Sequence, residues 1–396
     1  MQDPPAAGRW RILVLLATAE LLGMSLWFTA SAVAPSFAEQ WDLGSSEVGW
    51  LTTVVQLGFV AGTGLSALLN LADVIPARRL FAASAVLGAA ANLALLMVPG
   101  YAAALGVRFL TGFALAGVYP PAMKMAATWF RSGRGLAIGI IVGALTVGKA
   151  TPYLVRVFES TEAAPIVVTA SAGALLAALL IGLGYRDGPF AFPRRPFSWD
   201  LVGLVLRHRP TRLAIGGYLG HMWELYAMWT WVPVFLAASA AASSSSGDPT
   251  AWISWLAFGA IAAGGLGCVW GGWAADRVGR TRVVNLAMTV SGTCCLVAGL
   301  LLGASLWIVS ALVLVWGFFV VADSAQFSAL VTEVAPAHAV GTALTLQTSL
   351  GFLLTMGSIQ LTPVLVESGG WAWAFPVLAL GPAFGIAAMV RFARLR

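Results

Sequence analysis

Six residues that can carry charge stand inside long apolar stretches of this sequence. They are Glu20, Arg108, Lys149, His221, Glu224 and Asp323. A charged side chain at the centre of a lipid bilayer costs about 2.5–3.5 kcal/mol on insertion scales, so such residues usually face the protein interior or a water-filled cavity. Carboxyl and imidazole groups in such places favour proton exchange, and a buried lysine favours the binding of an anion or an acid.

Two of the acids belong to a repeated pattern of Glu-Leu-x-x-Met-x-x-Trp. The two copies are Glu20, Met24 and Trp27 and, later in the chain, Glu224, Met228 and Trp231. Positions i, i+4 and i+7 share one face of an α-helix, so each copy predicts a stripe along a helix. His221 precedes Glu224 by three positions and lies on the same side. The Met and Trp residues fit packing and ligand contact equally well.

The chemistry that these residues predict is proton-coupled binding. Removal from water favours the neutral form of a carboxyl group, so Glu20, Glu224 or Asp323 can load and release a proton. His221 titrates near neutral pH even when unperturbed. Lys149 is predicted to hold a substrate anion or to pair with an acid, and Arg108 to act as a structural or proton-tuning partner. The alternative for each acid is a hydrogen bond between helices, worth about 1 kcal/mol.

The composition requires a membrane around these residues. Of 396 residues, 59% are hydrophobic and 10% charged, with a mean hydropathy of +0.87, whereas soluble proteins have about 25% charged residues. Backbone groups cannot be left unpaired in lipid, so the apolar runs are predicted to be helices. Twelve runs have the length of a membrane span: 11–34, 47–69, 80–98, 103–127, 135–157, 164–184, 213–237, 251–274, 283–304, 307–330, 341–365 and 372–390.

Several classes of protein are excluded by what the sequence lacks. The basic residues are scattered between apolar runs, which disfavours binding of nucleic acid. There is no nucleophile–base pair, no metal-ligand spacing and no phosphate-binding loop, so we expect neither an enzyme nor a cofactor or metal site. The three cysteines lie in apolar runs and predict no disulfide framework. The first run is too long for a signal peptide and is predicted to be a span.

The loops between the spans predict the orientation. With the N-terminus in the cytoplasm, most loop arginines fall inside: Arg78, Arg79, Arg131, Arg134, Arg186, Arg194, Arg195, Arg207, Arg209, Arg212, Arg277, Arg280, Arg282, Arg391, Arg394 and Arg396. The other side receives Glu39, Asp42, Glu47, Glu159, Glu162, Asp248 and Glu367. This distribution follows the positive-inside rule and places both termini in the cytoplasm.

The chain divides into two halves of six spans. We predict an N-terminal bundle at 1–184, a cytoplasmic linker rich in Pro and Arg at 185–211, and a C-terminal bundle at 212–396. Besides the Glu-Leu-x-x-Met-x-x-Trp pattern, the loop sequence ADVIPARR at 72–79 matches ADRVGRTR at 275–282, and Gly112-Phe113 matches Gly317-Phe318. These matches recur in order at a near-constant offset, which indicates parallel structural repeats.

One loop carries a family resemblance. The segment GGWAADRVGRTR at 271–282 resembles the signature loop of the major facilitator superfamily, in which position 281 departs as Thr. The segment RFLTGFALAG at 108–117 is similar to the fourth-helix pattern of that family. The first-half loop is degraded, with Val74 and Pro76 where Arg and Gly are expected. The loop residues predicted to act as a conformational latch are Asp73, Arg78, Asp276, Arg277 and Arg280.

The resemblance implies an all-α membrane protein with twelve helices in two parallel-repeat bundles around a central cavity. The first helix of each half lines that cavity in the family, so Glu20 and Glu224 are expected to face each other across it. We predict a secondary transporter that moves a small organic solute by alternating access, coupled to protons. An uncoupled facilitator, or a membrane sensor that does not transport, remains the alternative. The expected setting is the cell (inner) membrane, with the protein as a monomer.

Overall fold

The chain folds into helices throughout the part that is described. The computed structural model describes residues 6–69, 71–130, 134–158, 162–190, 198–243, 249–336 and 338–395, and within these ranges it contains helices and no strand. The all-helical prediction is confirmed.

The first half contains α1 to α10. Their bounds are α1 Ala6–Met24, α2 Thr29–Ala32, α3 Ala34–Trp41, α4 Ser45–Leu68, α5 Leu71–Val74, α6 Ala77–Ala94, α7 Tyr101–Leu115, α8 Tyr119–Ala127, α9 Arg134–Phe158 and α10 Ala163–Gly184. The second half, preceded by α11 Trp199–Arg207, has α12 Arg209–Ala242, α13 Thr250–Val278, α14 Arg280–Ala298, the short 3₁₀ helix η1 Gly299–Leu301, α15 Leu306–Ala322, α16 Ser324–Val334, α17 Val340–Gly369, α18 Trp371–Leu378 and α19 Leu380–Ala393.

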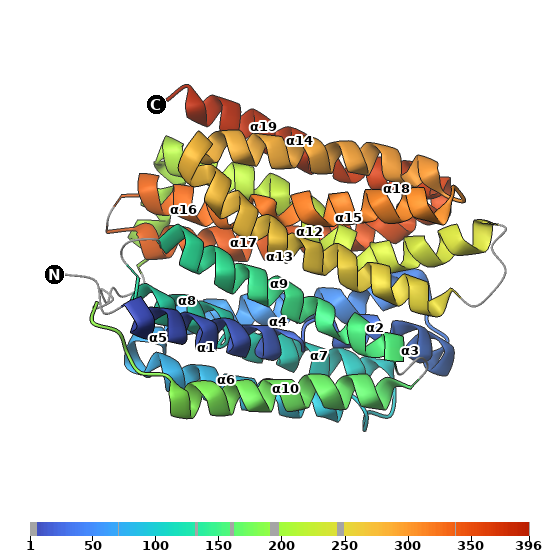
Figure 1. Cartoon of the computed structure of the whole chain (residues 1–396), viewed down its shortest axis with the longest axis horizontal. Coiled ribbons are helices and arrows are strands. Elements are labelled where there is room, and N and C mark those ends of the chain that lie inside the picture. The colour runs from blue at the N-terminus through green and yellow to red at the C-terminus, as the bar shows by residue number, and fades with distance from the viewer. Residues whose placement is uncertain are drawn as a thin grey trace.

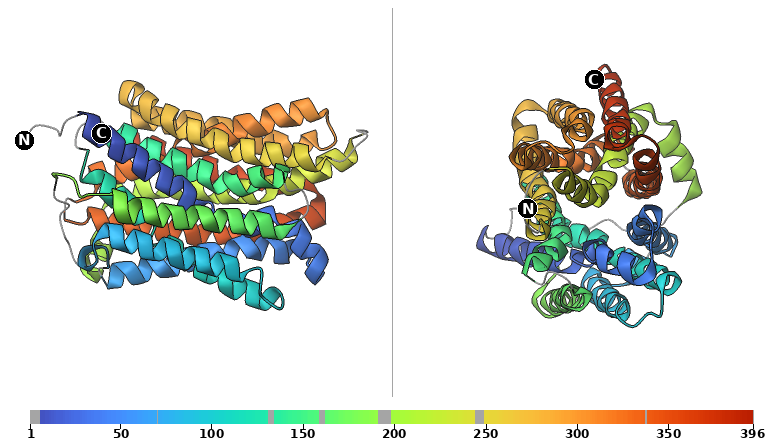
Figure 2. Two further views of the ribbon diagram at one scale, coloured as in Figure 1. Left: turned by 60° about the horizontal axis from the view of Figure 1, so that its bottom comes forward. Right: turned by 90° about the vertical axis from the view of Figure 1, so that its right-hand side faces the viewer.

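The helices agree with twelve membrane crossings. Ten helical stretches of the described chain are long and apolar enough to cross a membrane, and several join two labelled helices, as α7 and α8 do. The remaining two crossings are α1 with its continuation α2, and α6, which run beside the others in the bundle (Figure 2). The predicted fold class is therefore confirmed.

Two six-helix halves lie side by side. In Figure 1 the first half, blue to green, occupies the lower part of the bundle and the second half, yellow to red, the upper part, with both termini at the same end. Helices α9 and α13 meet where the halves adjoin, and α4 packs against α17 at a second contact.

The contact between α9 and α13 is close because small residues line it. A Cβ atom at Gly143 would lie 3.0 Å from the carbonyl oxygen of Gly265, and one at Gly139 would lie 3.4 Å from that of Cys268. Small residues allow helix backbones to approach in a membrane, where van der Waals packing drives association. The seam continues to the end of the helices, where the rings of Phe158 and Trp255 lie 6.3 Å apart.

Local sequence signals explain several helix ends. Helix α4 begins with a capping interaction, in which the backbone N–H of Gly44 donates to Glu47 Oε2 over 2.7 Å. Helix α13 ends at Gly279, whose φ of +90° turns the chain directly into α14. This φ favours glycine, which accounts for the glycine in the loop motif at 275–282.

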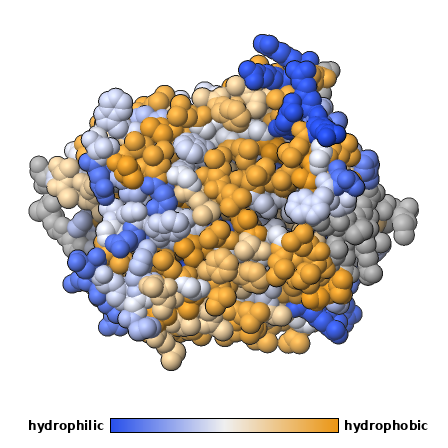
Figure 3. Space-filling model, turned by 180° about the vertical axis from the view of Figure 1, so that it is seen from behind, coloured by the Kyte–Doolittle hydropathy of each residue, from blue (hydrophilic) through white to orange (hydrophobic). Residues whose placement is uncertain are grey.

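The outer surface is apolar around the middle of the bundle. Large side chains such as Met97, Leu183 and Trp307 are more than four-fifths exposed. Figure 3 shows the hydrophobic colour spread across the middle of one face and the hydrophilic colour gathered toward the ends. A belt of this kind matches the hydrocarbon core of a bilayer.

The linker predicted at 185–211 contains a helix of its own. Helix α11 occupies Trp199–Arg207, and α12 begins at Arg209, slightly before the predicted start of the second bundle. Ser198 caps α11 by accepting a hydrogen bond from the backbone N–H of Asp200 over 3.3 Å. Two of the linker prolines, at 193 and 196, lie outside the described residues.

Candidate functional site

The first membrane crossing is interrupted beside the centre of the bundle. Helix α1 ends at Met24, residues 25–28 form a turn, and α2 begins at Thr29. The turn leaves backbone carbonyl groups of Leu26 and Trp27 without the usual helical partners. Discontinuous helices of this kind are tolerated in membranes where other groups supply the missing hydrogen bonds.

Arg108 supplies those hydrogen bonds. Its side chain is fully buried in α7, its Nη1 donates to the carbonyl oxygen of Leu26 over 3.1 Å, and its Nη2 donates to that of Trp27. Its Nε donates to the carbonyl of Leu51 over 3.4 Å, and Nη1 also reaches Asn92 Oδ1. The sequence predicts that Arg108 is a structural or proton-tuning partner of an acid. In the structure its hydrogen bonds go mainly to backbone carbonyl groups, and among the described residues none goes to an acid.

Lys149 lies at the centre of the molecule in a cage of aromatic rings. It is 2% exposed, and its Nζ lies 4.1 Å from the ring centre of Trp27, 4.8 Å from Tyr226 and 5.6 Å from Trp229. Its ammonium group also donates a hydrogen bond to the hydroxyl of Tyr226. Contacts of a cation with aromatic faces stabilise a buried ammonium group by about 2 kcal/mol when water is excluded.

A small cavity surrounds Lys149. Its volume is about 50 Å³, room for about one or two water molecules. The lining residues come from both halves and are Met24, Trp27, Phe59, Tyr119, Val142, Leu145, Thr146, Lys149, Tyr218, Met222, Leu225, Tyr226, Trp229, Val321, Ser324 and Phe352. Among these described residues, Lys149 alone carries a formal charge. We call this space the central cavity.

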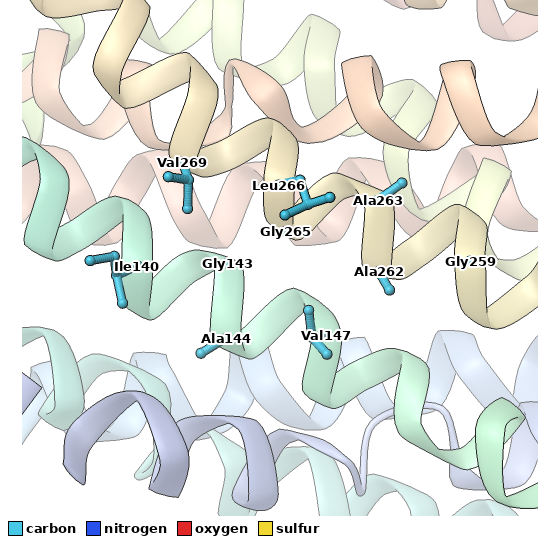
Figure 4. A pocket seen from close by; sticks show the side chains of 10 residues that line it. All are labelled: Ile140, Gly143, Ala144, Val147, Gly259, Ala262, Ala263, Gly265, Leu266 and Val269. Atoms are coloured by element: carbon cyan, nitrogen blue, oxygen red, sulfur yellow. The ribbon is translucent and has the colours of Figure 1, made fainter. Parts of the chain in front are cut away.

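A larger hollow of about 520 Å³ lies between α9 and α13, and Figure 4 shows the side chains that line it. These are Gly, Ala, Val, Ile and Leu residues, with Leu266 largely exposed. The hollow has no polar side chain among its described lining residues. It opens on the membrane-facing surface, where lipid chains fill such grooves, and so it is not the site.

Glu20 lies near Lys149 but has no hydrogen bond. The side chain is completely buried, and neither carboxyl oxygen has a partner among the described residues. Its charge and that of Lys149 are close enough to interact. The approach is set by Gly148, since a Cβ atom there would overlap the carbonyl oxygen of Leu21. Glycine at this position lets α9 bring Lys149 against α1 beside Glu20.

Glu224 has a different environment from the one the sequence predicts. It does not line the central cavity but lies inside the second bundle, where its carboxylate accepts three hydrogen bonds. The donors are Trp316 Nε1 at 2.6 Å, Ser291 Oγ at 3.0 Å and Cys295 Sγ at 3.1 Å. The expected arrangement, with two glutamates facing each other across a cavity, differs from the structure because these donors on α14 and α15 draw Glu224 away.

His221 and Asp323 form a buried pair in the second half. His221 Nδ1 lies 2.9 Å from Asp323 Oδ1, and both side chains are at most 2% exposed. Asp323 stands at the junction of α15 and α16, where the helix is interrupted. His221 also packs against the rings of Tyr218 and Phe327. The structure therefore brings together two of the predicted site residues, whose pairing the sequence does not predict.

The two tryptophans of the repeated pattern also differ. Trp27 lines the central cavity, and its Nε1 has no hydrogen-bond partner among the described residues. Trp231 lies outside that cavity and donates from Nε1 to the carbonyl oxygen of Ile359 over 2.9 Å. Trp231 thereby ties α12 to α17.

Uncharged polar side chains close the end of the bundle opposite the termini. Gln360 accepts from Ser46 over 3.2 Å and donates to Thr53 over 3.0 Å, and Thr355 donates to Gln56. These contacts join α4 of the first half to α17 of the second. Sequence reasoning missed them, although Gln56 stands in an apolar run and could have been singled out for that reason.

The aromatic lining of the central cavity was also missed in part. The rings of Trp27, Tyr226 and Phe352 lie within 5.6 Å of one another, and Phe59 lies 4.8 Å from Phe352. They come from the turn after α1 and from α12, α17 and α4. Aromatic residues are common in apolar runs, so composition alone could not separate these rings from packing residues.

The loop residues predicted as a latch occupy several environments. The carboxyl oxygens of Asp276 lie 3.8 and 3.9 Å from the Cβ position of Gly135, at the start of α9 in the other half. Arg280 pairs with Glu333 over 2.7 Å and with Gln326 over 2.7 Å, within the second half. Arg277 lies over the ring of Trp273. Arg78 is exposed at the start of α6, and the side chain of Asp73 lies outside the described residues.

Comparisons with known proteins agree with this fold. A family model described as the Major Facilitator Superfamily matches residues 15–358. The crystal structure of the nucleoside transporter NupG is similar over 97% of this chain and 99% of that chain, with a TM-score of 0.70 and 16% identity. A bacterial homologue of the human lysosomal transporter Spinster, inward-facing and unoccupied, is similar over 99% and 95%, with a TM-score of 0.70 and 15% identity. No curated protein sequence matches this chain.

Proposed function

Because the chain belongs to the major facilitator superfamily and is a multi-pass membrane transporter rather than an enzyme, we propose that it moves a small organic solute through the central cavity by alternating access, coupled to protons. The two solved structures share its fold at identities too low to carry over a substrate. The substrate and the coupling must therefore be argued from the residues of this chain.

The proposal rests mainly on the buried position of the Lys149 ammonium group. A fully buried ammonium group in a small cavity between two membrane bundles is costly unless it serves a ligand or an acid. The cavity around it is lined by both halves, so a solute bound there would contact both and could be passed between them. A cavity of about 50 Å³ is smaller than an organic solute, so the helices that line it would have to move apart for a solute to bind.

The two contacts between the halves support alternating access. The α9–α13 seam runs the length of the helices, whereas the described polar contacts between α4 and α17 extend from the end opposite the termini to the middle of both helices. A seam of small residues can serve as a pivot while the other contact opens and closes. Asp276 at the start of α9 would then stabilise one of the two positions, since a carboxylate is favoured at a helix N-terminus.

The orientation follows from the arginines. The loops at the end that carries both termini contain Arg78, Arg277 and Arg280, so this end faces the cytoplasm by the positive-inside rule. We therefore propose the cell (inner) membrane of its host as the location. The α4–α17 contacts then close the cavity on the outer side.

Glu20 is our candidate for the proton-carrying group. An ionised carboxylate without a hydrogen-bond partner is costly to bury, so a proton or a nearby cation must compensate it. Lys149 is that cation in the structure. Glu224 already has three donors and the His221–Asp323 pair lies inside the second bundle, so we assign these groups to support of the fold.

The proposal can be tested with matched solutes. Purified protein would be mixed with benzoate, benzylamine and benzyl alcohol, and with indole-3-acetate, tryptamine and indole-3-ethanol, while thermal stability is measured. The best-bound solute would then be followed into proteoliposomes with and without an imposed pH gradient. We expect stabilisation by at least one solute and uptake driven by the gradient.

Two variants serve as test and control. Lys149→Met should weaken solute binding by roughly 10- to 100-fold, because a charge-assisted contact contributes about 1.5–3 kcal/mol. Lys124→Met changes a lysine at the end of α8, away from the cavity, and should bind normally. Binding without uptake would indicate a sensor, and uptake unaffected by the pH gradient would indicate an uncoupled facilitator.

A further inference from the structure

The central cavity contains hydrogen-bond donors without acceptors. The Nε1 atoms of Trp27 and Trp229 are buried, and neither has a partner among the described residues. The ammonium group of Lys149 lies over both rings and donates one hydrogen bond among the described residues, to the hydroxyl of Tyr226. A buried donor that stays unpaired costs about 1–3 kcal/mol. A ligand that supplies acceptor oxygens would therefore gain more here than one that supplies donors.

The charge of the cavity lining also favours an anionic ligand. Lys149 is the only charged residue among the described residues that line the cavity, and no carboxylate lines it. The rest of the lining is mostly apolar or aromatic, as in Met24, Leu145 and Phe352, and includes the hydroxyl groups of Thr146 and Ser324. These features suit a planar or branched apolar body that carries a single carboxylate.

Glu20 competes with such a ligand for Lys149. Glu20 does not line the cavity. It precedes Leu21, whose carbonyl oxygen meets Gly148 next to Lys149, so its charge acts on Lys149 without a direct ion pair among the described residues. When Glu20 is ionised, its charge compensates Lys149. When Glu20 takes up a proton, the charge of Lys149 is no longer compensated. An anionic ligand can then replace Glu20 as the partner of Lys149.

The nearest other titratable groups are phenols and a thiol, and the paired His221 and Asp323 lie beyond them, beside the lining residues Tyr218 and Ser324. Tyr119 on α8, Tyr218 and Tyr226 on α12 and Cys268 on α13 are all buried or nearly so. Phenol and thiol groups are neutral at physiological pH in ordinary surroundings. Glu20 and Lys149 are therefore the groups whose charges decide what the cavity binds.

We infer that the solute is an organic monocarboxylate with an apolar body, and that it crosses with one proton as Lys149 exchanges Glu20 for the substrate carboxylate. This inference rests on the proposed function. In the unloaded form Lys149 is balanced by ionised Glu20. In the loaded form Glu20 is neutral and Lys149 is balanced by the substrate, so both forms that cross the membrane carry the same net charge.

Equal charge in the two forms makes transport electroneutral. In proteoliposomes, uptake of the carboxylate that stabilises the protein most should rise with a pH gradient that is acidic outside. A potassium diffusion potential set with valinomycin, at equal pH on both sides, should leave uptake unchanged. Uptake that responds to the potential would contradict the exchange of partners at Lys149.

Glu20→Gln separates coupling from folding. Glutamine resembles the protonated acid, so the variant should still bind the carboxylate and exchange it across the membrane against unlabelled solute. It should lose accumulation driven by the pH gradient and the dependence of binding on pH. Glu224→Gln, at the corresponding position of the second half, should keep both. Loss of exchange in folded Glu20→Gln protein would overturn the assignment.

The panel distinguishes failure of this inference from failure of the transporter. If benzylamine, tryptamine or the alcohols bind and are transported while the carboxylates are not, the protein is a transporter of another solute class and the carboxylate assignment is wrong. If a carboxylate binds but is not transported by the wild type, the proposed function fails while the ligand class stands. If no solute of any charge binds, both fail.

Discussion

The first helices of the two halves share a sequence pattern but not a structure. In the first half, Glu20 has no hydrogen bond, Trp27 lines the cavity, and the crossing is interrupted after Met24. In the second half, Glu224 accepts three hydrogen bonds, and α12 runs unbroken from Arg209 to Ala242. The same residues at the same spacing thus lie beside a cavity in one copy and in hydrogen-bonded packing in the other, and we propose ligand chemistry only for the first.

The difference arises from neighbours rather than from the repeated residues themselves. Arg108 on α7 holds the turn at Leu26 and Trp27, and the corresponding position in the second half is Val313, which is buried and apolar. Ser291 and Trp316 hold Glu224, whereas no described side chain donates to Glu20. A duplicated pattern can therefore diverge in function through substitutions on other helices.

The largest expected effect follows from removing Arg108. Arg108→Leu would leave the carbonyl groups of Leu26 and Trp27 without donors, and we expect a loss of about 3 kcal/mol in the free energy of unfolding, since each such group costs about 1–3 kcal/mol. Unfolding in detergent, followed by loss of tertiary fluorescence, measures it. Arg108→Lys should recover part of the loss, because it retains one donor.

Val313→Leu is the matched control and should cost less than about 1.5 kcal/mol. Equal losses at the two positions would remove the contrast between the halves.

The next effect compares the two acids directly. Glu224→Leu would leave Trp316, Ser291 and Cys295 without their acceptor, and we expect it to destabilise the protein by about 2–3 kcal/mol. Glu20→Leu removes a carboxyl group that has no hydrogen bond, but it leaves the charge of Lys149 stabilised only by its aromatic contacts, so we expect a smaller loss than at Glu224. Thermal shift of the two variants side by side gives the comparison. A larger loss at Glu20 would show that its contact with Lys149 supports the fold.

The smallest effect concerns the two tryptophans. Trp231→Phe removes the hydrogen bond to Ile359 and should cost about 1 kcal/mol in stability, while leaving the fluorescence response to a bound carboxylate intact. Trp27→Phe should remove most of that response, because Trp27 lines the cavity beside Lys149. Titration of each variant with benzoate measures both signals. If the response disappears with Trp231 instead, the ligand binds elsewhere.

Much of the fold could be predicted because membrane helices have strong sequence signals. Length and apolarity identified the crossings, and the loop at 271–282 identified the family, which the match over residues 15–358 confirms. The shared face of Glu20 and Met24 on α1 also followed from spacing, whereas Trp27 lies in the turn after α1. These are properties of single helices, and single helices are what periodicity reports.

The site depended on contacts that spacing does not report. The turn at residues 25–28 contains neither Gly nor Pro. No residue within the turn therefore predicts the break in α1. The side chain that stabilises the turn is an arginine on another helix. The donors to Glu224 come from α14 and α15, and the partner of His221 comes from the junction of α15 and α16. The packing of the whole bundle determines which of the two glutamates, Glu20 or Glu224, accepts hydrogen bonds.

The polar closure between α4 and α17 has a consequence for how this protein responds to its surroundings. Ser46, Thr53 and Gln56 meet Gln360 and Thr355 through hydroxyl and amide groups, without a charged side chain among these contacts in the described chain. Dissolved ions screen charges and leave neutral hydrogen bonds almost unchanged. If this contact opens and closes during transport, as proposed, its strength should change little between dilute and saline water.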